Sequence, residues 1–155
     1  MGQDGELHVG ASGLIRLDPR DAMFAQAVIA DLGVIAALAD GQRLFARCDA
    51  LGHVVRIVKP AVPTDPPNAW TVPDDLAAAT AVGMPLGRSG ETGAGRMGTG
   101  AGCGSTIAYD PGDWPRQGGV GSPGSADVLL MMLRQAAMNA AGTGDPSRQA
   151  WESEA

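Results

Sequence analysis

Apolar residues cover most sides of residues 125–142, which carry the strongest helix signal in the second half of the chain. Ser125 and Asp127 are typical of a helix N-terminus, because a serine oxygen accepts from a free amide and a carboxylate favours the positive end of the helix. Gly142 is suited to the left-handed conformation that ends a helix. The polar residues between these ends are Arg134, Gln135 and Asn139. The pattern therefore predicts a helix that is buried on most sides.

Shorter patterns in the first half of the chain predict two hairpins and a helix. Residues 6–9 and 14–17 flank a turn with glycines and are typical of antiparallel strands. Apolar residues at helical spacing follow, and they predict one helix over residues 18–41. Residues 43–48 and 53–59 flank the next turn, and β-branched residues in the second of these segments favour another hairpin.

Proline and glycine dominate much of the segment that follows. Prolines between residues 60 and 67 predict an extended surface connection, and residues 74–80 are read as a short helix. Nine glycines from residue 83 to residue 104 predict a flexible loop. Residues 93–98 have the glycine spacing of a dinucleotide-binding turn, but no strand or helix pattern flanks them, so flexibility is the favoured interpretation. A strand pattern returns at residues 105–109.

Bulk properties limit the class of protein. The 155 residues are 45% hydrophobic, which is enough for the core of one domain, and residues 1–155 are read as a single unit. A net charge of −6 without a basic cluster argues against binding to nucleic acid or to an anionic membrane surface. The first residues lack the basic and apolar regions of a Sec signal peptide. Asp31 interrupts the longest apolar stretch, so no membrane span is expected.

Cysteine and histidine residues offer little for a catalytic or metal site. Cys48 and Cys103 are expected to be separate reduced thiols, with a disulfide between them left open as the alternative. Cys103 lies between two glycines, but a nucleophilic cysteine needs a nearby base and no histidine is close in sequence, so a structural thiol is favoured. His8 and His53 lie in separate strand segments. A metal site formed with Cys48 is the alternative to two ordinary strand histidines.

The strand and the helix behind it carry a distinctive order of residues. Residues 105–111 read Ser-Thr-Ile-Ala-Tyr-Asp-Pro, and residues 131–136 of the helix read Met-Met-Leu-Arg-Gln-Ala. This order resembles the core of the bacterial secreted-effector zinc metallopeptidases, in which a Ser-Thr-Ile-x-Tyr-Asp-Pro segment leads into a helix with the motif His-Glu-Leu-x-His-Ala. The helix motifs align without gaps. The resemblance covers the C-terminal part of the chain well and the N-terminal part only loosely.

The alignment keeps the framework of that helix but not its chemistry. Leu133 and Ala136 match the family, whereas Met131 and Gln135 stand at the positions of the two zinc-binding histidines. Met132 stands at the position of the glutamate that acts as the general base. A thioether and a neutral amide are poor zinc ligands, and neither is a base at neutral pH. The methionines are interpreted as core residues, and a Cu(I) site is the less favoured alternative because no Cys or His lies nearby in the helix.

The resemblance also implies a fold and a place for a substrate. It predicts an α+β, zincin-like domain with a small, mostly antiparallel sheet and two main helices, one of them the former active-site helix. Residues 105–109 would form the edge of this sheet, where an extended substrate pairs. The groove residues implied in this way are Ser105, Thr106, Ile107, Ala108 and Tyr109. The family's third zinc ligand is an acidic residue further downstream, for which Glu152 and Glu154 are the positional matches, and the downstream part of the family domain is expected to be missing.

Two functions are consistent with this pattern. The first is a catalytically inactive member of the family, a pseudoenzyme that holds no zinc or other cofactor and binds a protein partner, or nothing, without cleaving it. The alternative is an active zinc metallopeptidase that acts on proteins and holds its metal elsewhere, for example through His8, His53 and a carboxylate. The expected location is the bacterial cytoplasm, or the outside of the cell after export by a specialised secretion system.

Overall fold

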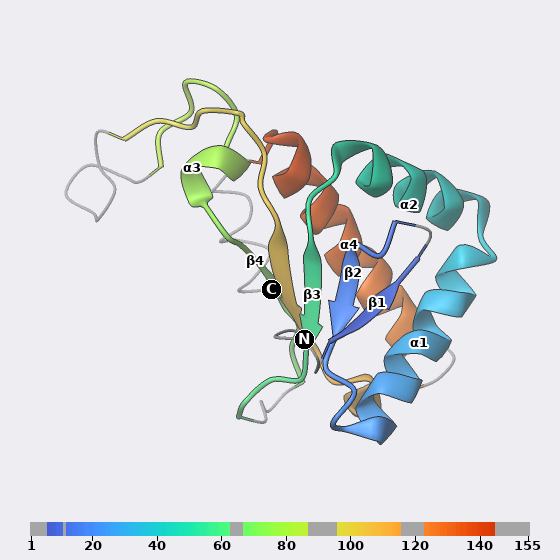
Figure 1. Cartoon of the computed structure of the whole chain (residues 1–155). Helices are drawn as coiled ribbons and strands as arrows, with labels where there is room; N and C mark the ends of the chain where they lie inside the picture. Colours follow the sequence, from blue (N-terminus) through green and yellow to red (C-terminus); the bar gives the residue numbers. More distant parts are fainter. Residues whose placement is uncertain (1–5, 11, 63–66, 87–95, 116–122, 145–155) are drawn as a thin grey trace.

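Helices cover one face of a five-stranded mixed sheet in an α+β fold (Figure 1). The computed structural model describes residues 6–10, 12–62, 67–86, 96–115 and 123–144. The strands are β1 (Leu7–Val9), β2 (Ile15–Leu17), β3 (Val55–Val58), β4 (Trp70–Pro73) and β5 (Ser105–Ala108). The helices of the described part are α1 (Ala22–Ala36), α2 (Ala39–Leu51), α3 (Leu76–Ala79) and α4 (Ser125–Ala141), with a short 3-10 helix, η1 (Pro111–Asp113), before α4.

The strands lie in the order β1-β2-β3-β5-β4. The outer pairs, β1 with β2 and β4 with β5, are antiparallel, whereas β2 with β3 and β3 with β5 are parallel. A parallel pair needs a long crossover connection, and α1 and α2 provide it between β2 and β3. The sheet is therefore mixed, and the expectation of a mostly antiparallel sheet was wrong.

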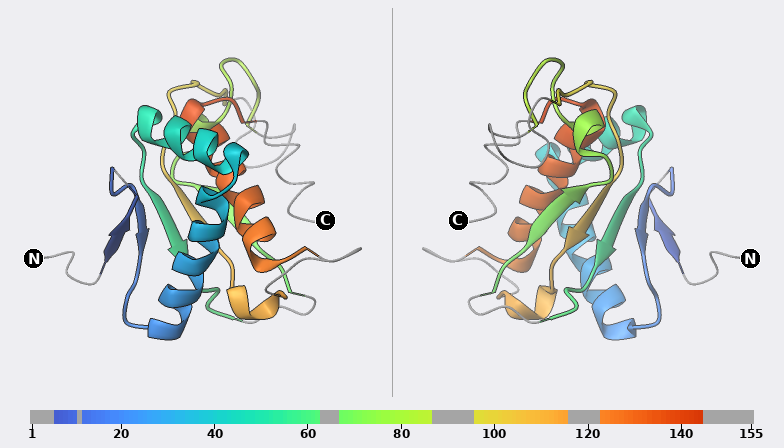
Figure 2. Two further views of the ribbon diagram at one scale, coloured as in Figure 1. Left: turned by 90° about the vertical axis from the view of Figure 1, so that its right-hand side faces the viewer. Right: turned by 90° about the vertical axis from the view of Figure 1, so that its left-hand side faces the viewer.

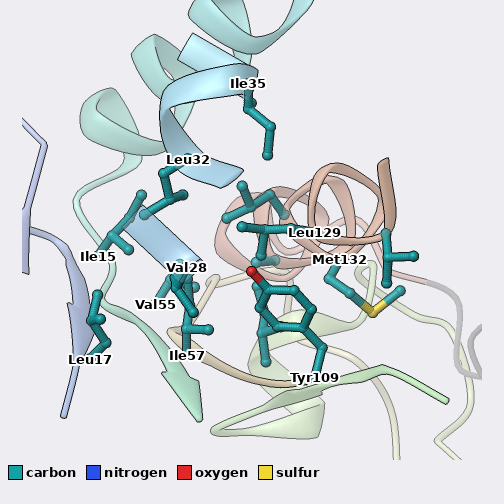
Figure 3. Close-up of a cluster of buried hydrophobic side chains, with 14 of the residues drawn as sticks. Ile15, Leu17, Val28, Leu32, Ile35, Val55, Ile57, Tyr109, Leu129 and Met132 are labelled. Atoms are coloured by element: carbon teal, nitrogen blue, oxygen red, sulfur yellow. The ribbon is translucent and has the colours of Figure 1, made fainter. Parts of the chain in front are cut away.

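Alternate strand residues point toward the helices and form the core. On β2, β3 and β5 the large apolar residues of this face are Ile15, Leu17, Val55, Ile57 and Ile107, each at most 8% exposed. They pack against the apolar faces of α1 and α4 in one cluster (Figure 3). Figure 2 shows α1, α2 and α4 on the same side of the sheet. The fold thus has two layers, with three long helices rather than the two expected.

Residues 18–48 depart most from the sequence-based expectation. The predicted helix over residues 18–41 begins only behind Asp21, which caps α1, and it ends at Ala36; the predicted strand at residues 43–48 is part of α2. Gly41 allows the two helices to meet closely, because a Cβ atom there would lie 1.8 Å from the carbonyl oxygen of Ile35. No single helix of the described residues is long and apolar enough to cross a membrane. Helices α1 and α2 together reach that length and apolar content, but they meet at a bend of 107°.

The first hairpin and the long C-terminal helix are confirmed. β1 and β2 form the hairpin, and Gly142 ends α4 in the left-handed conformation with φ 68°. Gly124 rather than Ser125 is the cap of α4, and the Gly124 amide donates to the Asp127 carboxylate at 2.9 Å. The side chain of Ser125 is therefore free to serve another contact, described below.

The middle of the chain contains a strand that the sequence did not predict. Residues 70–73, for which no strand is predicted, form β4, and the short helix predicted over residues 74–80 is α3, which begins behind the cap Asp75. β3 is a strand as predicted, although it pairs in parallel with its neighbours and not in a second hairpin. The predicted flexible loop and extended connection fall partly on residues 87–95 and 63–66, which lie outside the described residues.

Candidate functional site

The side chains at the family's motif positions lie on two sides of α4. Met132 is 7% exposed and belongs to the core, whereas Met131 is 50% exposed and Gln135 is half-buried. Leu133 and Ala136 are fully buried against the rest of the core. Residues 131 and 135 are about one helical turn apart, so they lie on the same side of the helix. The two positions that carry the zinc ligands in the family are thus accessible from solvent, and the position of the general base faces inward.

The edge strand β4 lies directly against this part of α4. The hydroxyl group of Thr71 donates to the carbonyl oxygen of Met132 at 3.1 Å and lies 3.4 Å from its sulfur atom. Figure 3 shows Met132 at the opposite end of the core cluster from Ile15 and Leu17. We call Met131, Met132 and Gln135, together with β4, the α4/β4 site.

The strand expected at the sheet edge is instead inside the sheet. β5 lies between β3 and β4, so the edge position predicted for residues 105–109 was wrong. Its side chains serve the core: Ile107 and Tyr109 are fully buried, Ala108 is buried, and the Ser105 hydroxyl accepts from the Asn139 side-chain amide at 2.9 Å; only Thr106 is partly exposed. The apolar character of β5 suits a strand with neighbours on both sides.

The main-chain groups of β4 that point away from β5 follow from its hydrogen bonds. The Asp74 amide donates to the Gly104 carbonyl at 2.9 Å. Because bonded and non-bonded pairs alternate along an antiparallel ladder, Trp70 and Val72 also bond to β5, and the main-chain groups of Thr71 and Pro73 point outward. Proline is tolerated at such a position because its missing N–H is not needed there. β4 is one of the two edge strands of the described sheet, with β1 at the other edge, and it has a neighbouring strand on one side only.

A buried polar cluster, which the sequence analysis missed, joins the helices to the sheet. Asp31 of α1 is 1% exposed and accepts from the hydroxyl of Tyr109 at 3.2 Å and from the hydroxyl of Ser125 at 2.8 Å. Tyr109 and Ser125 are fully buried. The signal that predicts this cluster is the single acidic residue inside the apolar face of α1, because a buried carboxyl group needs hydrogen-bond donors.

The cysteines are separate thiols, as the sequence analysis favoured, and the structure shows both to be buried. Cys48 and Cys103 are both free thiols. The Cys103 thiol donates to the carbonyl oxygen of Asp75 at 3.3 Å, which is a structural contact at the base of α3. Burial raises the pKa of the Cys48 thiol above its ordinary value, and the nearby Asp49 carboxylate adds to the rise. A raised pKa lowers the thiolate fraction and so lowers reactivity at neutral pH.

Metal ligands are not gathered in the part of the chain that the structure describes. Within these residues no group of three or more His, Cys, Asp or Glu side chains is arranged to hold a metal ion. His8 lies on the exposed strand β1, whereas His53 lies just before β3. Glu152 and Glu154, the positional matches to the third ligand of the resembled family, are outside the described residues, as are residues 93–95 of the 93–98 glycine motif.

No protein-family model, no curated protein and no solved structure matches this chain. The resemblance to the secreted-effector zinc metallopeptidases therefore rests on the motif residues of β5 and α4. A functional interpretation has to come from the chemistry of the α4/β4 site itself.

Proposed function

We propose that the protein is a catalytically inactive zincin-like protein that binds an extended protein segment at the α4/β4 site without cleaving it. One observation carries the proposal: beside an antiparallel edge strand, the helix positions that hold zinc and a base in the resembled family carry Met131, Met132 and Gln135. Two imidazoles one turn apart bind zinc because both nitrogens reach one point, and a neighbouring Glu activates the bound water. Thioether and amide groups do neither.

The edge of β4, which pairs with no second strand among the described residues, supports binding of an extended partner. A peptide that adds a strand to a sheet edge needs outward main-chain donors and acceptors, and Thr71 offers one of each. Pro73 offers only an acceptor, which limits the pairing to a short segment. Met131 is half-exposed, precedes the residue whose carbonyl accepts from Thr71, and presents a flexible apolar side chain of the kind found at adaptable binding surfaces. The partner expected from this chemistry is an extended segment with an apolar side chain.

Metal analysis of the purified protein tests the loss of catalysis. After incubation with zinc and removal of the excess, we expect no stoichiometric zinc by mass spectrometry and no hydrolysis of casein. Stoichiometric zinc with casein hydrolysis would overturn the proposal and favour an active metallopeptidase that holds its metal elsewhere.

A gain-of-function variant tests whether α4 has the geometry of a zincin helix. Met131→His with Gln135→His places two imidazoles one turn apart and leaves Met132 in the core. Because any exposed histidine pair at this spacing binds zinc weakly, the matched control is Gln42→His with Ala46→His on the exposed side of α2. We expect zinc to bind the α4 pair at least about tenfold more tightly than the α2 pair, a difference of about 1.4 kcal/mol. Equal affinities would reject the zincin alignment.

A peptide array tests the binding half of the proposal. Extended peptides that bind should lose affinity when alternate amides, and not the intervening ones, are N-methylated, because only one edge of an added strand pairs with β4. Thr71→Pro removes the outward donor of β4 and should weaken the same peptides. Peptide affinity that is unchanged by both N-methylation and Thr71→Pro would place the peptide away from β4 and overturn the proposed binding of an extended segment.

A further inference from the structure

A second feature of the molecule lies near β1 and β2, at the opposite edge of the sheet from β4. An apolar cavity of about 410 Å³ opens between the β1/β2 hairpin and helices α1 and α2. No residue of α4, β4 or β5 lines it, so it is separate from the α4/β4 site. Its apolar walls include Val9, Leu14, Ile15, Ile29, Leu32 and Phe45.

The size of this cavity is unusual for a packing defect. Protein interiors contain few voids much larger than one water molecule, and ligand pockets begin at about 300 Å³. Gly33 keeps the cavity open from the side of α1. A Cβ atom at Gly33 would meet nothing within 4 Å, so no neighbouring atom requires a glycine at this point of the helix. Glycine is less favourable than alanine inside a helix. What glycine provides at position 33 is a cavity wall without a side chain.

The polar groups at the cavity narrow the class of ligand. Asp49 and His53 are its polar lining residues, and no Lys or Arg side chain lines it. Ser12 of the hairpin loop donates to the Asp49 carboxylate, so the hairpin and α2 are joined at the rim. A carboxylate has further acceptor positions beyond this one contact. A ligand with a donor at its polar end is therefore favoured over an anionic ligand such as a fatty acid.

We propose that this cavity binds a compact apolar molecule that carries a hydroxyl or amine group directed toward Asp49. An apolar cavity of about 150 Å³ holds one benzene molecule, so the present one has room for roughly 16 non-hydrogen atoms. The site is independent of the proposed pseudoenzyme function, since neither zinc nor a peptide takes part in it.

Fluorescence titration with N-phenyl-1-naphthylamine, a neutral aromatic amine of about this size, tests the site. We expect saturable binding of one molecule per chain. Gly33→Leu places a side chain in the cavity and should weaken binding at least about tenfold, whereas Ala30→Leu, an exposed α1 position outside the lining, should leave it unchanged. Ala36→Leu, which also fills the cavity, serves as a second blocking variant. Far-UV circular dichroism checks that each variant is folded.

Competition and chemical protection localise the ligand and define its class. Dodecylamine should displace the dye more strongly than dodecanoate, and Asp49→Asn should remove that difference. In a Cys103→Ser background, the bound dye should slow alkylation of Cys48, which lines the cavity. No saturable binding, or undiminished binding by both the Gly33→Leu and the Ala36→Leu variants, would overturn the cavity as a ligand site. Stronger competition by dodecanoate would overturn the assigned ligand class.

Discussion

The hydroxyl group of Tyr109 is part of the polar cluster that joins the sheet to the two longest helices, α1 and α4. It donates to Asp31 of α1, which also accepts from Ser125 in the first turn of α4, and all three residues are buried. Tyr109→Phe removes this donor and keeps the ring, so it creates no large cavity. Loss of one hydrogen bond to a buried carboxyl group costs about 1–3 kcal/mol, because the acceptor stays buried. We expect the free energy of unfolding to fall by that amount.

Urea unfolding followed by far-UV circular dichroism measures this change. In a domain of this size each kcal/mol shifts Tm by about 2–4 °C, so Tyr109→Phe should lower Tm by about 2–12 °C. Thr99→Val is the matched control, because it removes an exposed hydroxyl whose two contacts, to the Ala77 carbonyl and from the Ala101 amide, are both long at 3.4 Å, and it should cost less than about 0.5 kcal/mol. The double variant with Ser125→Ala should show a coupling of about 0.5 kcal/mol or more, since both donors share Asp31. A Tyr109→Phe protein as stable as the parent would refute the role of this cluster.

The remaining stability predictions concern two glycines and a thiol. Gly33→Ala should stabilise the protein by about 0.5–1 kcal/mol, because alanine is the better helix former and its Cβ atom would meet no neighbour within 4 Å. Gly41→Ala should destabilise the protein, because its Cβ atom would collide with the Ile35 carbonyl. Urea unfolding of the two variants would contradict this if both free energies of unfolding changed in the same direction. In a Cys103→Ser background, Cys48 should react with iodoacetamide more slowly than a peptide thiol at mildly alkaline pH, because burial raises its pKa. The folded protein therefore binds the Cys48 thiol proton more tightly than the unfolded chain does. The stabilisation from this tighter binding is fully present below the usual thiol pKa of about 8.5, and it is lost as the pH rises through the higher pKa of the folded state. Equal alkylation rates would contradict the assignment.

Elements with a strong local signal were predictable from the sequence. α4 combines a continuous apolar run with a terminal glycine, and the β1/β2 hairpin combines alternating residues with a glycine turn, so local physics alone specifies both. α2 was missed because residues 43–48 contain only a short apolar run, residues 44–46, which periodicity does not assign to helix or strand. Its burial comes from Leu44, Phe45 and Cys48, whose spacing fits a helix once α1 and α4 are in place to cover them.

The error at the candidate site has a different physical origin. β4 is only four residues long and ends in a proline, so the strand preference of Trp70, Thr71 and Val72 is too short to predict a strand, and its pairing with β5 is a tertiary interaction. Without a predicted β4, nothing in the sequence opposed the edge position that the resemblance implied for residues 105–109. The site residues on α4 were found from the motif alignment, but no motif indicates that Met132 faces the core while Met131 faces outward. That difference is set by which side of the helix the sheet covers.

Met132 belongs to both the core and the α4/β4 site, and this double role makes a further prediction. The glutamate that the resembled family carries here would have its carboxylate next to Thr71, at a position that is 7% exposed. We expect Met132→Glu to lower the free energy of unfolding by about 2–4 kcal/mol at neutral pH, while Met131→His and Gln135→His each change it by less than about 1 kcal/mol. Met132→Gln, which has the same shape without the charge, is the control and should cost less.

The pH dependence of the same variant separates charge from shape. Desolvation raises the pKa of a buried glutamate, so the folded Met132→Glu protein binds its proton more tightly than the unfolded chain. Its deficit relative to Met132→Gln should therefore shrink as pH falls through that raised pKa, in urea unfolding measured at several pH values. A constant deficit would mean that the side chain at 132 lies in water in the folded protein. If the deficit does shrink, methionine stabilises the folded protein at this buried position and a charged glutamate does not, which is the physical difference between Met132 and the glutamate of the resembled family.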